Sequence, residues 1–453
     1  MLFRSFLVSP GVNTSEIDLT TSVPAVGTST GATVGFFRWG PANSVIQVSA
    51  ETDLAAKFFK PDSNTAVSFL SAANFLSYGN DLRVVRVIND TAGTATSSNN
   101  ATSNSSHAAI IANDEEYFNN RYGTANTNVA FAARYPGSIG NSLKISVCAT
   151  ESGFSGWAYA SLFDAAPNTS FYTSTVTGSS TIKDELHLVV VDEDGVISGI
   201  ANTVLERYPN LSKCSDAKGD DGSSIYYKEV LFRNSKYIHW LGHAAGSNSA
   251  NAWGQTAAAA YATGTPMHSP TVATTTYSLS NGADGTPKVS NVVGAIDLFA
   301  NKEKYDVSLI FSGDGLVSAN SSFTESDYTT IVNEVITVAD GRKDSVGFIS
   351  PPYANSVTST QKSTDVTAFR NGNGLLDTSY GVIDSGWKYQ YDKYNDVYRW
   401  IPLNADIAGL CVRTDLQRDP WFSPAGLQRG QIRNLVKLSF NPSQSEQIGR
   451  AHV

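Results

Sequence analysis

A strand–helix–strand pattern over residues 306–350 constrains the fold more than any other feature of this sequence. The apolar runs at 306–311 (DVSLIF) and 345–350 (SVGFIS) have the length and composition of buried strands. Between them, a capping pair at Thr324 and Asp327 opens a predicted helix that reaches Ala339. Strands joined by a crossover of this length pair in parallel through a right-handed connection, so the pattern predicts an α/β unit.

The first ninety residues repeat this rhythm. Strands are predicted at 34–37, 45–48 and 82–88. A helix over 51–59 has Ser49 as its predicted N-cap, and a second helix over 65–77 ends just before Gly79. We therefore expect one discontinuous α/β core domain over residues 31–88 and 292–440.

The middle of the chain, residues 89–291, is predicted to be an inserted β-rich domain. Strands are expected at 144–147 and as a hairpin over 186–191 and 196–200, joined by Asp192-Glu193-Asp194-Gly195. The two aspartates favour a turn over a calcium loop, because the further ligands of such a loop are missing. Residues 91–106 are polar and of low complexity, which is typical of a mobile loop or a shortened insertion.

Composition narrows the possible partners. The 453 residues carry 32 Lys and Arg against 41 Asp and Glu, a net charge of −9, without a basic block. Such a chain is a poor candidate for binding nucleic acid or an anionic membrane. No apolar run approaches the ~18 residues that a membrane span needs, and the N-terminal apolar run is too short for a signal peptide. The three cysteines form no CxxC motif, which favours a reducing site of synthesis over a disulfide framework.

Residues 1–30 are predicted to form an extended N-terminal arm. Ser9-Pro10-Gly11-Val12 is a turn signal, and the β-branched residues that follow favour a strand over a helix. An arm of this kind cannot bury its own apolar residues, so it has to lie on another surface. A frayed terminus is the alternative that the residues leave open.

An aromatic hairpin is predicted over residues 386–402. Trp387, Tyr389 and Tyr391 alternate as a strand requires, and a polar loop precedes a return strand with Tyr398 and Trp400. A short helix over 404–413 and a rigid turn over 420–426 follow. We expect the hairpin and the turn mainly to pack the inner domain, with a surface role for some of the aromatic residues left open.

The sequence contains no convincing catalytic or metal-binding set. His239 and His243 have the spacing of a helical zinc pair, but the catalytic glutamate and helix-forming neighbours are missing. The loop Ser312–Gly315 follows a predicted parallel strand, where α/β folds bind ligands, but it lacks the glycine pattern of a phosphate site. We therefore predict no catalytic, cofactor or metal residues. An α/β enzyme or ligand-binding protein that uses this loop is the alternative.

Several segments, in order along the chain, resemble the contractile phage tail sheath proteins of the T-even type. The two longest are 74–88 (NFLSYGNDLRVVRVI) and 386–431, which begins GWKYQYDKYNDVYRWIP. Shorter matching landmarks are SPGV near residue 10, GFFRWGPA at 35–42, ARYPGSIGNSLKISV at 133–147 and SVGFISPP at 345–352. A β-rich adhesin or tail fibre would instead predict trimeric repeats, which the sequence lacks.

The resemblance implies a structural virion protein rather than an enzyme. Sheath subunits assemble in the host bacterial cytoplasm as stacked hexameric rings around a tail tube, between a baseplate and a tail terminator. The implied partners are other copies of the chain and those three proteins, without nucleic acid, membrane insertion or a cofactor. Terminal arms add strands to neighbouring subunits, so the interface residues expected in the arm are Ser9, Pro10, Gly11, Val12 and Glu16.

Two departures from the sheath pattern are expected. The outward-facing domain of large sheath proteins is predicted to be absent or reduced at 91–106. Residues 441–453 leave the family pattern, and 448–453 match what one frame of a sequencing adapter encodes, so these six residues are predicted to be read-through. A C-terminal arm would then be missing, and this chain alone should polymerise poorly. The host, and whether the device is a phage or a phage-derived injection system, stay open.

Overall fold

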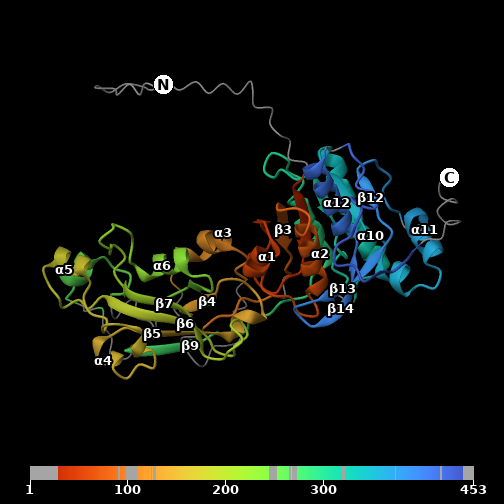
Figure 1. Cartoon of the computed structure of the whole chain (residues 1–453). Helices are drawn as coiled ribbons and strands as arrows, with labels where there is room; N and C mark the ends of the chain where they lie inside the picture. Colours follow the sequence, from red (N-terminus) through yellow and green to blue (C-terminus); the bar gives the residue numbers. More distant parts are fainter. Residues whose placement is uncertain are drawn as a thin grey trace, which may run out of the picture.

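A computed structural model describes residues 29–89, 92–97, 110–123, 125, 129–243, 252–264, 267, 273–318, 322–372, 374–418 and 421–441. The chain is mixed α/β with several sheets, as predicted. In Figure 1 the red and blue segments, from the two ends of the described chain, form one lobe, and the yellow and yellow-green segments from its middle form another. Among the described residues, no helix is long and apolar enough to cross a bilayer.

The first lobe is built on a six-stranded sheet with the order β12-β11-β10-β1-β3-β2. Its strands are β1 (Gly31–Gly35), β2 (Val45–Val48), β3 (Leu82–Arg86), β10 (Leu309–Phe311), β11 (Val346–Ile349) and β12 (Gly381–Ile383). All neighbours pair in parallel except β2 and β3. Early and late parts of the sequence meet where β1 pairs with β10, with Gly31 opposite Leu309. The parallel pairing of β10 and β11 confirms the predicted strand–helix–strand unit.

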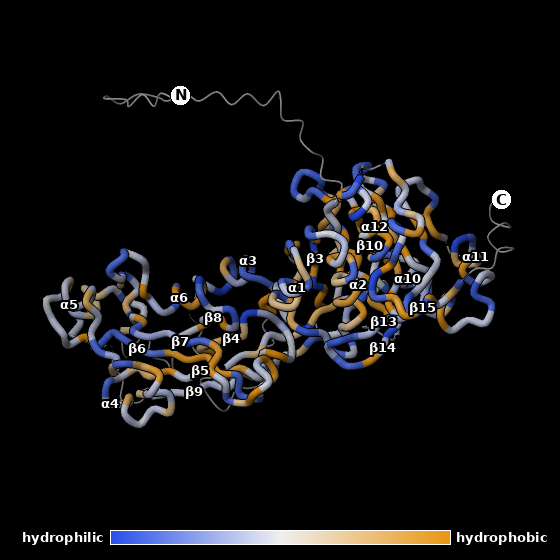
Figure 2. Tube along the Cα trace, viewed as in Figure 1, coloured by the Kyte–Doolittle hydropathy of each residue, from blue (hydrophilic) through white to orange (hydrophobic). Residues whose placement is uncertain are grey.

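Helices cover both faces of this sheet because its strands alternate between two apolar clusters. On one face, Val84 and Phe311 pack with α1 (Glu51–Phe58), α2 (Ala66–Leu76) and α12 (Asn404–Gln417). On the other face, Val85 and Ile310 pack with α9 (Val289–Asp297) and α10 (Glu325–Arg342). Figure 2 shows the hydrophobic segments gathered in this interior. A parallel sheet with helices on both faces buries nearly all of its strands.

The second lobe has a four-stranded antiparallel sheet with the order β7-β6-β5-β9. These strands are β5 (Leu143–Cys148), β6 (Glu185–Asp192), β7 (Thr203–Ser212) and β9 (Thr274–Ser278), and beside them β4 (Phe131–Ala133) pairs with β8 (Ile238–Trp240). The helical segments are short: α3 (Asp114–Tyr117), η1 (Phe118–Tyr122), η2 (Ser138–Ser142), α4 (Glu151–Phe154), η3 (Ala160–Leu162), α5 (Phe171–Thr177), α6 (Tyr227–Asn234) and α8 (Ala257–Ala262).

A three-stranded antiparallel sheet completes the first lobe. It has the order β14-β13-β15, with β13 (Trp387–Asp392), β14 (Val397–Pro402) and β15 (Lys437–Leu438). The segment that precedes it contains η6 (Ala354–Thr358) and α11 (Lys362–Gly372). The predicted aromatic hairpin is thereby confirmed as β13 and β14, and the predicted helix after it extends beyond Arg413 to Gln417 as α12.

The predicted hairpin over 186–191 and 196–200 is wrong in its second strand. The partner of β6 is β7, which begins at Thr203. The Asp192 carboxylate accepts hydrogen bonds from the Ile197 and Ser198 amides and from the Ser198 hydroxyl, so 196–200 folds as a turn around it. This geometry confirms the turn interpretation of Asp192.

Three predicted details of the first lobe also need correction. The first strand spans Gly31–Gly35 rather than 34–37. Ser49 does not cap α1; its amide donates to the Asp53 carboxylate (3.1 Å), and the N-cap position is Ala50. The backbone of Gly79 is not left-handed, so backbone conformation does not explain why a glycine follows α2. A Cβ atom there would lie 2.7 Å from Val412 Cγ1, so the glycine permits the close approach of α12.

The start of α10 follows its prediction closely. The Thr324 hydroxyl accepts a hydrogen bond from the Asp327 amide, and the Asp327 carboxylate accepts one from the Thr324 amide. This reciprocal pair satisfies amide groups that the first turn of a helix leaves without partners. The helix itself continues three residues past Ala339, to Arg342.

Candidate interaction site

The β13–β14 hairpin has the polar side chains of β13 inside and, apart from the buried Trp387, its aromatic side chains on the opposite face. Lys388, Gln390 and Asp392 are buried on the face that packs into the lobe. On the opposite face, Tyr391 is 46% exposed and Tyr398 is 53% exposed. Trp387 is buried, as expected for a residue that packs the inner domain, and the two exposed tyrosines match the surface role that was left open for some of the aromatic residues.

Each buried polar residue of β13 has a specific partner. Lys388 Nζ lies 2.8 Å from the Asp406 carboxylate at the start of α12. The Asn74 amide of α2 donates to Gln390 Oε1 at 2.9 Å. These contacts satisfy the buried groups, which would otherwise be strongly destabilising, and they fix the hairpin with its polar face inward.

Burial dominates the electrostatics of this network. Loss of solvation lowers the pKa of Lys388, and the Asp406 carboxylate partly opposes that shift. Loss of solvation likewise raises the pKa of Asp406, against the effects of Lys388 and of the Tyr78 hydroxyl. Nearby, burial raises the pKa of Asp384 to about 8, although the Ser350 hydroxyl donates to it at 2.6 Å.

The outer face of the hairpin is a ladder of aromatic rings. Tyr389 lies opposite Trp400 with ring centroids 4.9 Å apart, and Tyr391 lies opposite Tyr398 at 5.3 Å. The ammonium group of Lys437 on β15 lies 4.9 Å from the Tyr389 ring centre and 5.5 Å from that of Trp400. Cross-strand aromatic pairs of this kind stabilise a sheet and leave an apolar surface.

Within the described part of the chain, the outer edge of β14 has backbone groups without partners. The Tyr389 and Trp387 carbonyls accept hydrogen bonds from Val436 and Ser439, on the β15 side. Because backbone groups alternate along a strand, β13 bonds to β14 through residues 388, 390 and 392. The amide and carbonyl groups of Tyr398 and Trp400 must then point away from the sheet, and no described residue pairs with that edge.

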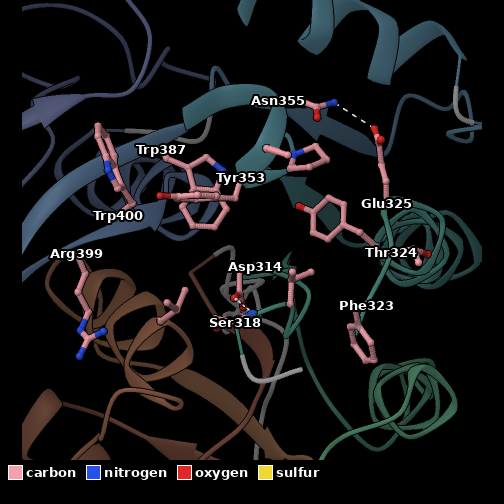
Figure 3. A pocket seen from close by; sticks show the side chains of 15 residues that line it. Asp314, Ser318, Phe323, Thr324, Glu325, Tyr353, Asn355, Trp387, Arg399 and Trp400 are labelled. Atoms are coloured by element: carbon pink, nitrogen blue, oxygen red, sulfur yellow. Dashed lines mark hydrogen bonds between the residues drawn. The ribbon is translucent and has the colours of Figure 1, made fainter. Parts of the chain in front are cut away.

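A cavity of about 540 Å³ lies beside this edge. Figure 3 shows its side chains converging from the ends of β10 and β11, the start of α10 and the hairpin. Its aromatic lining consists of Phe323, Tyr328, Tyr353, Trp387 and Trp400, and its polar lining of Asp314, Ser318, Thr324, Glu325, Asn355 and Arg399. Cavities of roughly 300–1,000 Å³ with such linings are typical binding sites.

The loop Ser312–Gly315 borders this cavity but directs its polar groups into the protein. The Asn404 side-chain amide donates to Ser312 Oγ and to the Gly313 carbonyl at 3.1 and 2.6 Å. The Asp314 carboxylate accepts the amides of Leu316 and Ser318 at 3.1 and 3.0 Å. These bonds stabilise the loop from within and leave a largely apolar cavity next to it.

The histidine pair is split between two environments. His239 lies on β8, stacked on Tyr117 with ring centroids 3.9 Å apart, and its Nε2 is 3.4 Å from the Asp114 carboxylate. His243 Nδ1 lies 2.6 Å from the Tyr227 hydroxyl. Burial lowers the pKa of both histidines to about 4. Within the described part of the chain, no three His, Cys, Asp or Glu side chains gather as metal ligands would.

The turn after α12 is more exposed than expected. Trp421 is 77% exposed and Phe422 is 38% exposed, which contradicts a mainly packing role for the Trp421–Gly426 part of that turn. The predicted interface residues Ser9, Pro10, Gly11, Val12 and Glu16 lie outside the described residues, as do residues 91 and 98–106 of the low-complexity segment and the final residues 448–453. Residues 92–97 of that segment are described and are buried.

Sequence reasoning missed the free edge of β14 and the cavity beside it. The alternation of Lys388, Gln390 and Asp392 with three aromatic residues was visible, and it defines two faces. It does not say which face is buried, because the partners of Lys388 and Gln390 come from α12 and α2. The signal in the sequence that could have identified the buried face was the possible ion pair between Lys388 and Asp406.

This chain is similar to known proteins in part or nearly all of its length. The family "Tail sheath protein Gp18 domain III N-terminal region" matches residues 28–87. The tail sheath protein of Enterobacteria phage T4 is 27% identical to this chain, in an alignment that covers 97% of this chain and 78% of the T4 protein. That of Vibrio phage KVP40 is also 27% identical, covering 98% of this chain and 78% of its own length.

Two solved structures are similar at lower identity. The sheath tail protein of Listeria innocua has a TM-score of 0.45 at 11% identity, with 93% of this chain and 62% of that chain covered. That of Desulfitobacterium hafniense has a TM-score of 0.43 at 10% identity, with 97% and 70% covered. The chain thus spans less than two thirds of the Listeria protein.

The matches to the T4 protein and to the sheath family identify the class of this protein. It is a structural component of a phage virion, and not an enzyme. Within that class, the chain belongs to the T4-like contractile phage tail sheath proteins.

Proposed function

We propose that this protein polymerises as stacked hexameric rings around a tail tube and shortens to drive that tube through the host envelope. In this proposal the copies are held to one another by strand addition, and the tube, baseplate and tail terminator proteins are the other partners. In this proposal the chain consists of an extended arm over 1–30, an α/β core domain over 31–88 and 292–440, and a β-rich domain over 89–291.

The unpaired edge of β14 is the observation that carries this proposal. The backbone groups of Tyr398 and Trp400 point outward beside an exposed aromatic face. An unpaired strand edge is a template for another strand, and main-chain hydrogen bonds of this kind survive reorientation of the rigid parts. We assign Ser9–Glu16 of a neighbouring copy as the added strand, with Ser9, Pro10, Gly11, Val12 and Glu16 in the contact.

Photo-cross-linking from the edge tests this assignment without assuming a register. Benzoylphenylalanine replaces Tyr398 in the full chain, which is mixed with isotopically labelled wild-type chain, and the products are mapped by mass spectrometry. We expect adducts between labelled and unlabelled chains within residues 9–16. Adducts confined to one chain, adducts to other segments, or none would contradict the assignment.

Electron microscopy tests the assembly itself. When the protein is produced together with the tail tube protein, we expect striated cylinders around the tube. A Tyr398→Pro variant removes one outward amide and should form none, because proline cannot donate to an added strand. Tyr398→Val keeps that amide and serves as the matched control. Cylinders from the proline variant would show that β14 is not the acceptor edge.

A further inference from the structure

The cavity beside β14 continues directly from its unpaired edge. Trp400 supplies outward backbone groups to the edge and a side chain to the cavity wall, and the adjacent Arg399 also lines the cavity. Figure 3 shows Trp400 and Arg399 on one side of this space and Phe323 across it. A strand that pairs with β14 therefore runs alongside the cavity and can place side chains in it. This inference rests on the proposed function.

The direction of β14 determines which end of an added strand reaches the cavity. The strand runs from Val397 to Pro402, and Trp387, opposite Pro402, belongs to the cavity wall. The sheet is antiparallel throughout. An arm added in the same antiparallel sense enters from the Pro402 end, so the residues that precede its paired stretch lie at the cavity.

The cavity is suited to apolar side chains. Its large aromatic rings face the space, while most of its polar atoms already have partners in the protein. Trp387 Nε1 donates to the Pro351 carbonyl at 2.8 Å, and the Asn355 amide donates to Glu325 at 3.1 Å. Placing an aromatic or aliphatic side chain there removes apolar surface from water without stranding a polar group.

The chain itself contains a segment with this chemistry in the required position. Residues 2–8 (LFRSFLV) immediately precede the assigned strand 9–16 and are apolar except for Arg4 and Ser5. We propose that this cavity binds the large apolar side chains of residues 2–8 of a second copy, with Phe6 the principal one. The cavity then acts as the specificity pocket of the strand-addition site.

The topology of the sheet favours a second copy over the same chain. Because β1 runs parallel to β10, its first residue, Gly31, lies at the opposite end of the sheet from the cavity, which opens beyond the last residues of β10. The described chain therefore begins, at residue 29, on the far side of its own lobe from its own cavity.

Thiol cross-linking between two full-length variants tests the pairing. One copy carries Ser5→Cys, which adjoins Phe6 and leaves it in place, and the other carries Ala354→Cys, a cavity-lining position. Both are in a Cys411→Ala background because Cys411 is the half-buried native thiol. A short bismaleimide should join the two copies. Ala368→Cys, an exposed position on α11, replaces Ala354→Cys as the matched control and should give no product.

Self-association provides a second readout. Phe6→Ala, or Ala354→Trp to fill the cavity, should weaken self-association measured by sedimentation at least about tenfold. Ala368→Trp should leave it unchanged, and circular dichroism checks that each variant folds. Equal self-association of Phe6→Ala and wild type, or cross-links found only within one chain, would overturn the proposal.

The outcomes separate this inference from the proposed function. If the Tyr398 photo-cross-link to residues 9–16 persists while the cysteines at positions 5 and 354 never join, strand addition stands and the pocket assignment fails. If neither contact forms, both proposals fail.

Discussion

The strands of the β-rich lobe and the β13–β14 hairpin solve the same packing problem in opposite ways. In β6, every residue from Leu186 to Asp192 is buried. Successive apolar residues of this strand belong alternately to two apolar clusters, one on each face of the sheet. In the hairpin, Lys388 and its polar neighbours face inward, while Tyr391 and Tyr398 face outward. A sheet covered on both sides needs apolar residues on both, whereas a sheet with paired ions inside can keep an apolar face for a partner.

The largest expected effects separate the two kinds of core. Leu188→Ala in β6 should lower the free energy of unfolding by about 2–5 kcal/mol, because it leaves a cavity in a close-packed sheet. Lys388→Met should cost a similar ~3–5 kcal/mol, because it strands the buried Asp406 carboxylate. Denaturant unfolding measures both.

A second substitution distinguishes the two mechanisms. Lys388→Met combined with Asp406→Leu should recover most of the loss, because no buried charge remains. Leu188→Ala has no partner whose removal would restore stability. If the double variant is no more stable than Lys388→Met alone, the hairpin does not depend on this ion pair.

The two regions should also respond to pH in opposite directions. Burial raises the pKa of Asp384 from 3.8 to about 8, so its stabilising contribution is complete below about pH 4 and is lost as the pH rises to about 8. For Asp192, burial raises the pKa, but hydrogen bonds from Ser142, Ser198 and Ile197 outweigh it and lower the pKa overall. Its contribution is present above its unfolded pKa and is lost as the pH falls.

Unfolding free energies measured across this pH range test the contrast. Asp384→Asn should remove the decline between about pH 4 and pH 8. Asp192→Asn should instead flatten the loss at acidic pH. Identical pH profiles for wild type and Asp384→Asn would show that the carboxyl group near the hairpin is ionised in the folded protein.

A smaller effect on stability is expected on the aromatic face. Tyr398→Ser removes a cross-strand ring contact of a half-exposed residue, which is worth about 0.2–1 kcal/mol. Its effect on self-association should be much larger, because the apolar face is then interrupted. Thermal unfolding and sedimentation of the same sample compare the two. A loss of stability as large as that of Leu188→Ala would mean that this face belongs to the core.

The smallest expected effect concerns Lys437, whose ammonium group lies above Tyr389 and Trp400. Lys437→Met keeps the aliphatic stem and removes the charge, and should cost about 0.5–1 kcal/mol. Lys437→Arg, which retains the charge, is the matched control. Urea unfolding of the three proteins resolves the difference, and a methionine variant as stable as wild type would assign the contact to packing alone.

Local patterns were predicted best where local chemistry decides the structure. The capping pair of Thr324 and Asp327, the parallel strands β10 and β11, and the aromatic pairing of β13 with β14 all follow from residues close together in the sequence. The errors lie where distant residues intervene. The Asp192 carboxylate accepts hydrogen bonds from a turn, so β7 begins only at Thr203. Gly79 is explained by the close approach of Val412 and not by its backbone conformation.

The sequence by itself determined the alternating pattern of the hairpin, the α/β rhythm at both ends of the chain and its sheath family resemblance. Only the tertiary structure decided that the polar face of the hairpin is buried, that no described residue pairs with one edge of β14 and that a cavity lies beside it. The physical reason is that alternation defines two equivalent faces of a strand. Which face turns inward depends on Asp406 and Asn74, partners that folding brings from remote helices.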